Sequence, residues 1–429
     1  MLHVQRRRLI ALDVRGRSDQ IVTQTYTGMT LPVPAHEVAS PSRDVGMPSS
    51  VSRRGAIGTA LRYTPAVNTE TPPTGPSGLV RTHEPPPAQL VVDGCYRFGT
   101  YNGPIARINP LDVVTATGAR GRLQRAVRNA RLKEWEAFQL GDDALFVLGA
   151  VYDTKSISLL QVLVVDKQAA TIRRWEQKVP TSMVHVARGL DHTRSHGRVG
   201  RFSLQLTNEM DSGLVAVDAS HPGRGALPPL ELHGAGRCGP GEAGHLVICH
   251  PFADNRALYS HKTMMPFAGT LRAGAELTVL EPDRSFMILD DHHGDYPSPM
   301  QYDWVTAVRR SDGGRVEGFN LTDNQVRDPQ RYNENAVWLG DRVHRLPAVH
   351  VERPDGPWGP WIVRDADGSG QVEVRFTPTV RSEMHVGPRR SLAEYYAPFG
   401  WYEGRIHTDD VDLSVDGMFG MGEQKFIRI

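Results

Sequence analysis

The feature that most constrains the fold of this chain is a series of short apolar segments that begins near residue 90 and continues to the C-terminus. Segments such as DALFVLGAVYD, SLLQVLVVDK and QVEVRFTP contain alternating apolar and polar residues, as strands with one buried face do. Turn pairs such as DG, GD and GG separate them. Strands at this spacing, with few helical patterns between them, predict an all-β protein built from antiparallel barrels or sandwiches.

Residues 1–85 differ from the rest of the chain. They are rich in Pro, Ser and Thr, as in TETPPTGPSG, and they lack a periodic apolar pattern. A segment of this kind buries too little apolar surface to offset the entropy lost on ordering, so we expect it to be extended or disordered. The remaining residues are numerous enough for two domains.

One segment, GRLQRAVRNARLKEWEAF at 121–138, is typical of a helix because Leu123, Val127 and Ala130 recur at helical spacing. Its arginines could contact nucleic acid or lipid headgroups. A solvated helix that caps a barrel explains them as well, and it is the interpretation we prefer.

The net charge of the chain gives no general attraction to nucleic acid, since its 49 Lys and Arg residues are balanced by 48 acidic residues. No run of 18 apolar residues occurs, and the N-terminal LIAL is too short for a signal peptide. Three cysteines, Cys95, Cys238 and Cys249, form no CxxC pair and indicate neither disulfides nor structural zinc. We expect a cytoplasmic protein without a nucleic-acid partner or stable membrane insertion.

Common cofactor and catalytic motifs are missing from the sequence. There is no GxSxG, P-loop, HExxH or GxGxxG, so hydrolase, NTPase, zinc-protease and dinucleotide-binding functions have no support, and we expect no cofactor. DADGSGQVEVRF resembles a calcium loop, but Phe376 stands where a bidentate Glu is required, so a hairpin turn explains it better.

The segment DDHHGDYP, 290–297, carries the densest chemistry and follows the apolar run FMIL. On a strand, Asp290 and His292 would share one face, and Asp291 and His293 the other. An Asp-x-His pair on one face can act as a general acid or base or anchor a polar ligand. A structural polar network and a metal site are the alternatives. Strand alternation allows only one of the two pairs to face a cavity.

Other segments contribute candidate ligand-binding residues. Met264 and Met265 could line an apolar cavity, although ordinary core packing explains them equally well. Asn320 and Asn335 lie in a polar segment that could bind a polar ligand head, but asparagines in loops usually form turns. Glu423 follows a Gly-rich bend within an apolar strand and is either paired with a base or solvent-facing.

Five segments together resemble the bacterial domain-of-unknown-function family 2804 (DUF2804). They are KEWEAF, SHKTMMPFAG, FMILDDHHGDYPSPMQYDW, EGFNLTDNQVRDPQRYNENAVW and DGMFGMGEQKFIR, and the resemblance covers roughly 90–429. The layout is more distantly similar to the carotenoid 1,2-hydratase and AttH-like superfamily. This resemblance implies two lipocalin-like (calycin) antiparallel β-barrels packed side by side with few short helices, the first at 86–298 and the second at 299–429.

Acidic and aromatic residues meet at the junction of these expected barrels. We hypothesise an enzyme that binds a lipophilic small molecule, such as an isoprenoid, polyketide or lipid, in an inter-barrel cavity and transforms it by acid-type catalysis such as hydration or isomerisation. Asp291 or Asp303 would be the acid, kept protonated by burial. The alternative is a non-catalytic lipid carrier.

The remaining expected roles follow from this hypothesis. His292 or His293 would orient the acid or hold water, with the neighbouring Asp290 as a further catalytic candidate. Aromatic rings at the junction would bind the ligand and stabilise a developing cation, and these are Tyr296, Tyr302 and Trp304.

Overall fold

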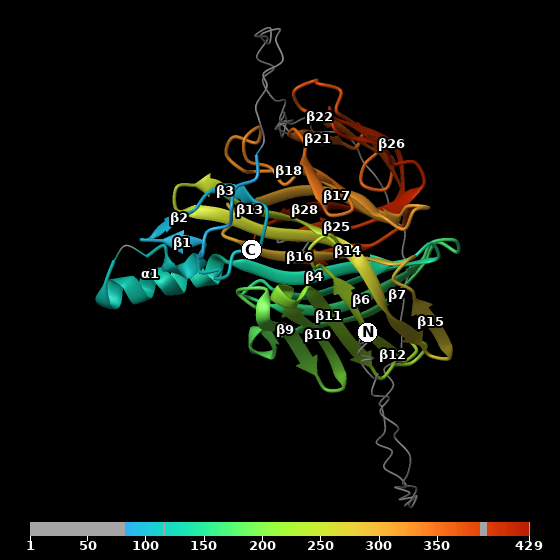
Figure 1. Cartoon of the computed structure of the whole chain (residues 1–429). Coiled ribbons are helices and arrows are strands. Elements are labelled where there is room, and N and C mark those ends of the chain that lie inside the picture. The colour runs from blue at the N-terminus through green and yellow to red at the C-terminus, as the bar shows by residue number, and fades with distance from the viewer. Residues whose placement is uncertain (1–81, 115, 387–392, 429) are drawn as a thin grey trace, which may run out of the picture. The chain divides into compact units, whose positions relative to one another are not determined.

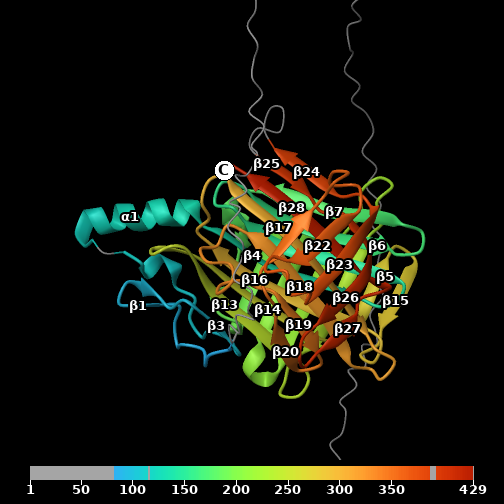
Figure 2. The same ribbon diagram turned by 90° about the horizontal axis from the view of Figure 1, so that it is seen from above.

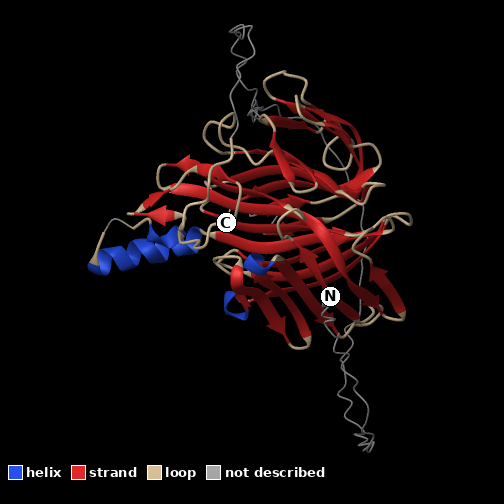
Figure 3. Cartoon of the chain, viewed as in Figure 1, coloured by secondary structure: helices blue, strands red, loops and turns tan. Residues whose placement is uncertain are grey.

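The computed structural model describes residues 82–114, 116–386 and 393–428. These residues belong to one compact unit, Gly75–Ile429. Most of the segment predicted to be extended or disordered, residues 1–81, lies outside the described residues. The described part of the chain consists almost entirely of strands (Figure 3).

Fourteen strands form the first sheet. In chain order they are β3 (Gly99–Tyr101), β4 (Lys133–Gly141), β5 (Leu145–Asp153), β6 (Ser158–Asp166), β7 (Thr171–Val179), β8 (Val184–His185), β9 (Asp191–Val199), β10 (Phe202–Glu209), β11 (Leu214–His221), β12 (Leu230–Arg237), β13 (Gly244–Ala253), β14 (Arg256–Ala273), β15 (Glu276–Leu280) and β16 (Phe286–Gly294). Eleven of them follow the antiparallel order β7-β6-β5-β4-β16-β14-β12-β11-β10-β9-β8. Because β8 and β9 lie against β5, the sheet curls into a nearly closed barrel (Figure 1). A separate pair, β1 (Val91–Val92) and β2 (Cys95–Tyr96), precedes it.

The burial pattern of the first sheet explains its curvature around a core. On β10, Phe202, Leu204 and Leu206 are buried, whereas Ser203 and Gln205 between them are half-buried. Such alternation places one face of each strand inside the barrel. On β4 and β16 every residue is buried, because the second sheet covers their outer face.

Twelve strands form the second sheet. They are β17 (Met300–Arg310), β18 (Val316–Asn324), β19 (Ala336–Leu339), β20 (Arg342–Arg345), β21 (Val349–Glu352), β22 (Trp361–Asp365), β23 (Val372–Val380), β24 (Glu383–Val386), β25 (Ala393–Tyr396), β26 (Phe399–His407), β27 (Asp412–Ser414) and β28 (Met418–Ile427). The main order is β20-β19-β18-β17-β28-β26-β23-β22-β21, and β21 returns beside β18. The sheet therefore curls around its own core, which includes Phe319, Trp361 and Tyr402.

Apolar side chains also fill the space between the sheets. Trp135 and Ile288 from the first sheet pack in one cluster with Trp304 and Phe419 from the second. The outer face of β4 and β16 is thereby set against β17 and β28 (Figure 2). The predicted all-β, two-barrel fold class is confirmed, with a nearly closed first barrel and a curled half-barrel as the second.

The described part of the chain contains one α-helix, α1 (Gly118–Arg131), and three short 3-10 turns, η1 (Pro110–Asp112), η2 (Thr181–Met183) and η3 (Met210–Ser212). The helix predicted at 121–138 is wrong beyond Arg131, because Leu132 has extended backbone and KEWEAF belongs to β4. A strand buried on both faces lacks polar alternation, and this is why its sequence was compatible with a helix. Among the described residues, no helix combines the length and apolar character needed to span a bilayer.

Candidate functional site

The Asp/His segment lies on β16, whose two faces have different surroundings. Asp290 and His292 point toward the second sheet, where they contact Trp135 and Tyr296. Asp291 and His293 point into the first barrel. All of these side chains are buried. The segment therefore contributes to two separate polar clusters, one on each side of the first sheet.

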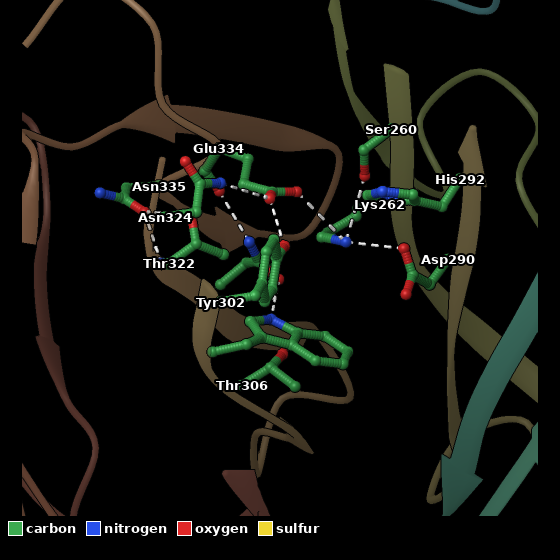
Figure 4. Close-up of polar contacts among 12 residues, drawn as sticks. Ser260, Lys262, Asp290, His292, Tyr302, Thr306, Thr322, Asn324, Glu334 and Asn335 are labelled. Atoms are coloured by element: carbon green, nitrogen blue, oxygen red, sulfur yellow. Dashed lines mark hydrogen bonds and ion pairs between the residues drawn. The ribbon is translucent and has the colours of Figure 1, made fainter. Parts of the chain in front are cut away.

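Lys262 on β14 lies at the centre of the cluster between the sheets (Figure 4). Its ammonium is 2.6 Å from Asp290 Oδ1 and 3.4 Å from Glu334 Oε2, and it donates to Ser260 Oγ at 3.2 Å. Burial alone would lower the pKa of Lys262, but Asp290 and Glu334 outweigh burial and raise it. Lys262 is thus a buried cation held between one acid from each sheet.

The polar segment before β19 completes this cluster from the second sheet. Tyr302 donates its hydroxyl proton to Glu334 Oε1, and burial together with Glu334 raises the pKa of Tyr302. Asn320 accepts from Trp304 Nε1 at 2.6 Å and donates to the carbonyl of Glu334 at 2.7 Å. Asn335 accepts a β18 backbone N–H at 2.7 Å. The two asparagine amides therefore bond to the protein itself and fix Trp304 and the loop.

His292 is held between two aromatic rings. It stacks on Trp135 with the ring centroids 3.7 Å apart, and its Nε2 is 2.6 Å from the hydroxyl of Tyr296. Burial, followed by Lys262 and Lys425, lowers the pKa of His292 well below its usual value, whereas burial raises that of Tyr296. A neutral imidazole accepts the Tyr296 hydrogen bond at Nε2, and the buried Nδ1 of His292 has no hydrogen-bond partner among the described residues.

A cavity of about 150 Å³ lies beside this cluster, between the two sheets. Much of its apolar wall comes from the first sheet and includes Ala137, Leu148, Ala150, Tyr152 and Leu159. Trp135 and Trp304 line it from opposite sheets. Ile157 and Lys178, which also line it, are exposed, so the cavity reaches the surface there.

Asp290, Glu423 and Lys425 are charged groups that line this cavity. Asp290 accepts from Trp135 Nε1 at 3.1 Å. Glu423 Oε2 lies 2.6 Å from Lys425 Nζ, and Tyr395 donates its hydroxyl proton to Glu423 Oε1. Burial and the neighbouring Glu423 raise the pKa of Tyr395 well above its usual value, so this phenol stays protonated.

Two lysines cross the space between the sheets in opposite directions. Lys262 of the first sheet lies 4.9 Å from the ring centroid of Trp304 in the second. Lys425 of the second sheet lies 4.9 Å from the ring centroid of Trp135 in the first. Desolvated cation–π contacts stabilise by about 2 kcal/mol each, so both indole rings are held firmly as cavity walls.

The cluster inside the first barrel has a different character. His293 lies 2.9 Å from Glu134 Oε1 and 3.2 Å from Asp291 Oδ1. Burial would lower the pKa of His293, but Asp291 and Glu134 raise it to about 9. Burial, and then Asp291, raises the pKa of Glu136, which pairs with Asp291 in the β4–β16 register. None of these four side chains lines the cavity between the sheets.

Three other residues predicted to belong to the site lie away from the cavity. Asp303 is on the opposite face of β17 from Trp304 and lies 2.7 Å from Arg353 Nη2. Burial, partly offset by Arg353, raises the pKa of Asp303 to about 6. Met264 packs between the sheets and Met265 inside the barrel, and neither lines the cavity.

Several cavity and cluster residues were not predicted as site residues, namely Trp135, Lys262, Glu334, Tyr395 and Lys425. The sequence feature that could have indicated Lys262 as a site residue is the position of this lysine inside the apolar strand run LYSHKTMMPF. The signal for Lys425 is its spacing of two residues from Glu423, which places both on one face of a strand.

Metal-ligand geometry among the described residues occurs elsewhere. Ligand atoms of Asp191, His192, Glu209 and Asp211 all lie within 4.8 Å of one another at the surface. Exposed acidic groups of this kind are common without a metal. The segment DADGSG forms the turn between β22 and β23, where Asp365 accepts the backbone N–H of Val372 at 3.0 Å, as predicted for a hairpin.

The chain is similar to solved structures and to one protein family. The chain is similar to CghA in a crystal structure with Sch210972, at TM-score 0.42 and 13% identity over 70% of this chain and 88% of that one. It is also similar to kievitone hydratase from Nectria haematococca, at TM-score 0.45 and 11% identity over 68% of this chain and 88% of that one. The comparison with curated proteins gave no match. Residues 86–428 match the family described as a domain of unknown function, DUF2804, and the chain belongs to this family.

Proposed function

We propose that the protein binds a lipophilic small molecule in the cavity between its sheets and transforms it by proton transfer, as in hydration or isomerisation. One observation carries the proposal: an apolar wall and two carboxylates, Asp290 and Glu423, line the same cavity. An apolar pocket with a few convergent polar groups is the usual form of a small-molecule site. The apolar wall favours a lipophilic ligand over a sugar or nucleotide.

The volume of the cavity limits what can enter it. About 150 Å³ is the size of an apolar cavity that holds benzene. A ring or a branched five-carbon unit would fit beside Asp290, and the remainder of a larger ligand would extend toward Ile157 and Lys178 at the surface.

Charged groups of opposite sign line the cavity and are suited to opposite roles in proton transfer. Lys262 and Trp135 both donate to Asp290, so its oxygens act as acceptors and can take a proton from water or from a ligand C–H. The Lys425 ammonium, which Glu423 positions from 2.6 Å, lines the same cavity and would form the proton-donating side. Different environments for two groups in one site divide acid and base roles between them.

A non-catalytic carrier is the second candidate function. It is favoured by the cationic partner that each carboxylate already has, Lys262 for Asp290 and Lys425 for Glu423. Paired groups of this kind can hold the polar end of a ligand without reacting with it. A carrier would release its ligand unchanged.

Isotope incorporation tests the proposal. The protein would be incubated with a panel of isoprenoid alkenes and conjugated enones in H₂¹⁸O and, separately, in D₂O, and the products analysed by mass spectrometry. We expect ¹⁸O or deuterium in at least one compound. Asp290→Asn and Glu423→Gln should each lower the rate at least about 100-fold, the usual contribution of a positioned acid or base.

Asp303→Asn is the matched control, because it removes a mostly buried carboxylate that lies on the other face of β17. It should leave the rate within about threefold of the wild type, a small change beside the usual acid–base contribution. Label incorporation that survives in the Asp290→Asn and Glu423→Gln variants would overturn the assignment of these residues. Compounds that bind the wild type, fail to bind the cavity-filling variant Ala150→Phe and never acquire label would establish a carrier instead.

A further inference from the structure

Helix α1 exposes an apolar face that no described part of the chain covers. Leu123 is 65% exposed and Val127 is 49% exposed, and Ala119, Ala126 and Ala130 beside them are exposed as well. At about 100° per residue these positions fall on one side of the helix. Exposed apolar side chains gathered in this way mark an interaction surface more often than scattered ones do.

The same helix is strongly basic and contains no acidic residue. Arg120 and Arg122 are exposed and flank the apolar face on its two sides, and within the described residues neither forms an ion pair. The exposed surface of α1 is therefore an apolar stripe bordered by positive charge.

The opposite side of the helix is fixed to the first barrel. Arg128 is buried, and its guanidinium lies 3.0 Å from Asp295 Oδ2 and 2.7 Å from the carbonyl of Asn255. Arg131 lies 2.8 Å from the same carboxylate. Figures 1 and 2 both show α1 extending outward from the sheets, with its C-terminal end beside them. The anchored side thus leaves the apolar face turned away from the barrel.

We propose that α1 docks parallel to the surface of a bilayer that contains anionic phospholipid. Leu123 and Val127 would enter the boundary between headgroups and acyl chains, and Arg120 and Arg122 would pair with phosphates on either side. A basic amphipathic helix of low net hydrophobicity lies in the membrane interface in this way without crossing it. The proposal is independent of the cavity chemistry.

Charge complementarity selects this occupant over others. A second copy of the chain would place arginine against arginine. The N-terminal residues 1–81 carry ten arginines and five acidic residues, so their net charge is positive and does not complement that of α1. Nucleic acid would satisfy the arginines but would leave the apolar stripe without a partner.

Vesicle flotation with the full chain tests the proposal. The protein would be mixed with vesicles of phosphatidylcholine alone or with about one third phosphatidylglycerol, a composition that supplies the anionic surface required. We expect flotation with the anionic vesicles only, weakened by salt. Replacing Arg120 and Arg122 by Gln should weaken binding about fivefold per arginine. Leu123→Glu with Val127→Glu should abolish flotation.

The matched control replaces two equally exposed apolar residues on β15, Leu277 and Val279, which are 51% and 53% exposed. Leu277→Glu with Val279→Glu should float like the wild type. In a Leu123→Trp variant, lipids brominated on the acyl chains should quench the new fluorescence, which a purely electrostatic contact would not produce. Absence of flotation with anionic vesicles, or flotation unaffected by the Leu123 and Val127 substitutions, would overturn the proposal. Self-association that these substitutions abolish would overturn it in favour of a second copy.

Discussion

Removing the cation between the two sheets should have a large and specific effect on stability. Lys262→Met keeps an unbranched apolar side chain, one atom shorter, but deletes the charge. Asp290 would lose its 2.6 Å contact with the ammonium, and Glu334 its 3.4 Å contact. Both carboxylates are at least nine-tenths buried, so they would remain as buried, uncompensated charges.

Breaking a buried ion pair on one side usually costs about 3–5 kcal/mol of unfolding free energy, mainly because a charge is left without a partner. We expect the cost of Lys262→Met to lie at the upper end of this range, since the substitution leaves two carboxylates without a cation rather than one. The triple variant Lys262→Met, Asp290→Asn, Glu334→Gln removes all three charges and should recover most of the loss, because neutral replacement of a whole buried cluster is often close to neutral in stability.

Urea unfolding followed by circular dichroism measures these differences as shifts of the transition midpoint. Arg327→Met is the matched control, because it breaks a pair of similar length, 2.8 Å to Asp254, at the exposed surface. It should change the free energy of unfolding little. A Lys262→Met variant within about 1 kcal/mol of the wild type, or a triple variant no more stable than the single one, would refute the buried-charge argument.

Two further predictions concern the first barrel and the β17–β28 pair. His293 has its pKa raised from the usual 6.5 to about 9, so the stability that its charged form contributes should be fully present below pH 6.5 and lost as the pH rises to about 9. At about 1.4 kcal/mol per pH unit this amounts to about 3 kcal/mol of unfolding free energy, which urea unfolding at both ends of the pH range measures. If the His293→Gln variant lost as much stability over the same pH range, the loss would not come from His293. Gly420→Ala would bring a Cβ atom to 2.0 Å from the carbonyl oxygen of Thr306, so a cost of about 1–3 kcal/mol is expected, whereas Gly313→Ala, with a nearest neighbour at 4.0 Å, should be tolerated. If the two alanine variants had the same free energy of unfolding, β17 and β28 would separate easily enough to accommodate the added methyl group.

The all-β class could be predicted from local sequence patterns, whereas the two-barrel layout was implied by the family resemblance. β10 alternates buried and half-buried residues along its whole length, and its sequence alternates in the same way. The end of α1 could not be predicted on the same basis. β4 is buried on both faces, so one face carries both Glu136 and the apolar Phe138, the alternation of polar and apolar residues breaks off there, and the sequence was also compatible with a continued helix.

The site could be predicted only in part for a related reason. Strand alternation separated Asp290 and His292 from Asp291 and His293, and this division holds on β16. Which pair faces a cavity depends on what covers each side of the sheet, and that cover comes from distant parts of the chain. Lys262 could be paired with Glu334, 72 residues away, only once the sheets were in place. The acid roles expected for Asp291 and Asp303 stay predictions, and neither residue lines the cavity between the sheets.

The arrangement of the two clusters on β16 also constrains what each can do. The cluster inside the barrel combines a histidine of raised pKa with Asp291 and Glu136, whose pKa values burial raises, and none of these side chains lines the cavity between the sheets. The cluster between the sheets depends on both sheets at once, because Lys262 and Glu334 belong to different ones. Any change that separates the sheets removes Glu334 from Lys262 and at the same time opens the cavity. We therefore expect substitutions that weaken the contact between the sheets to weaken ligand binding in the cavity as well. Lys262 couples the two properties, because it takes part in the contact between the sheets and holds Asp290 at the cavity.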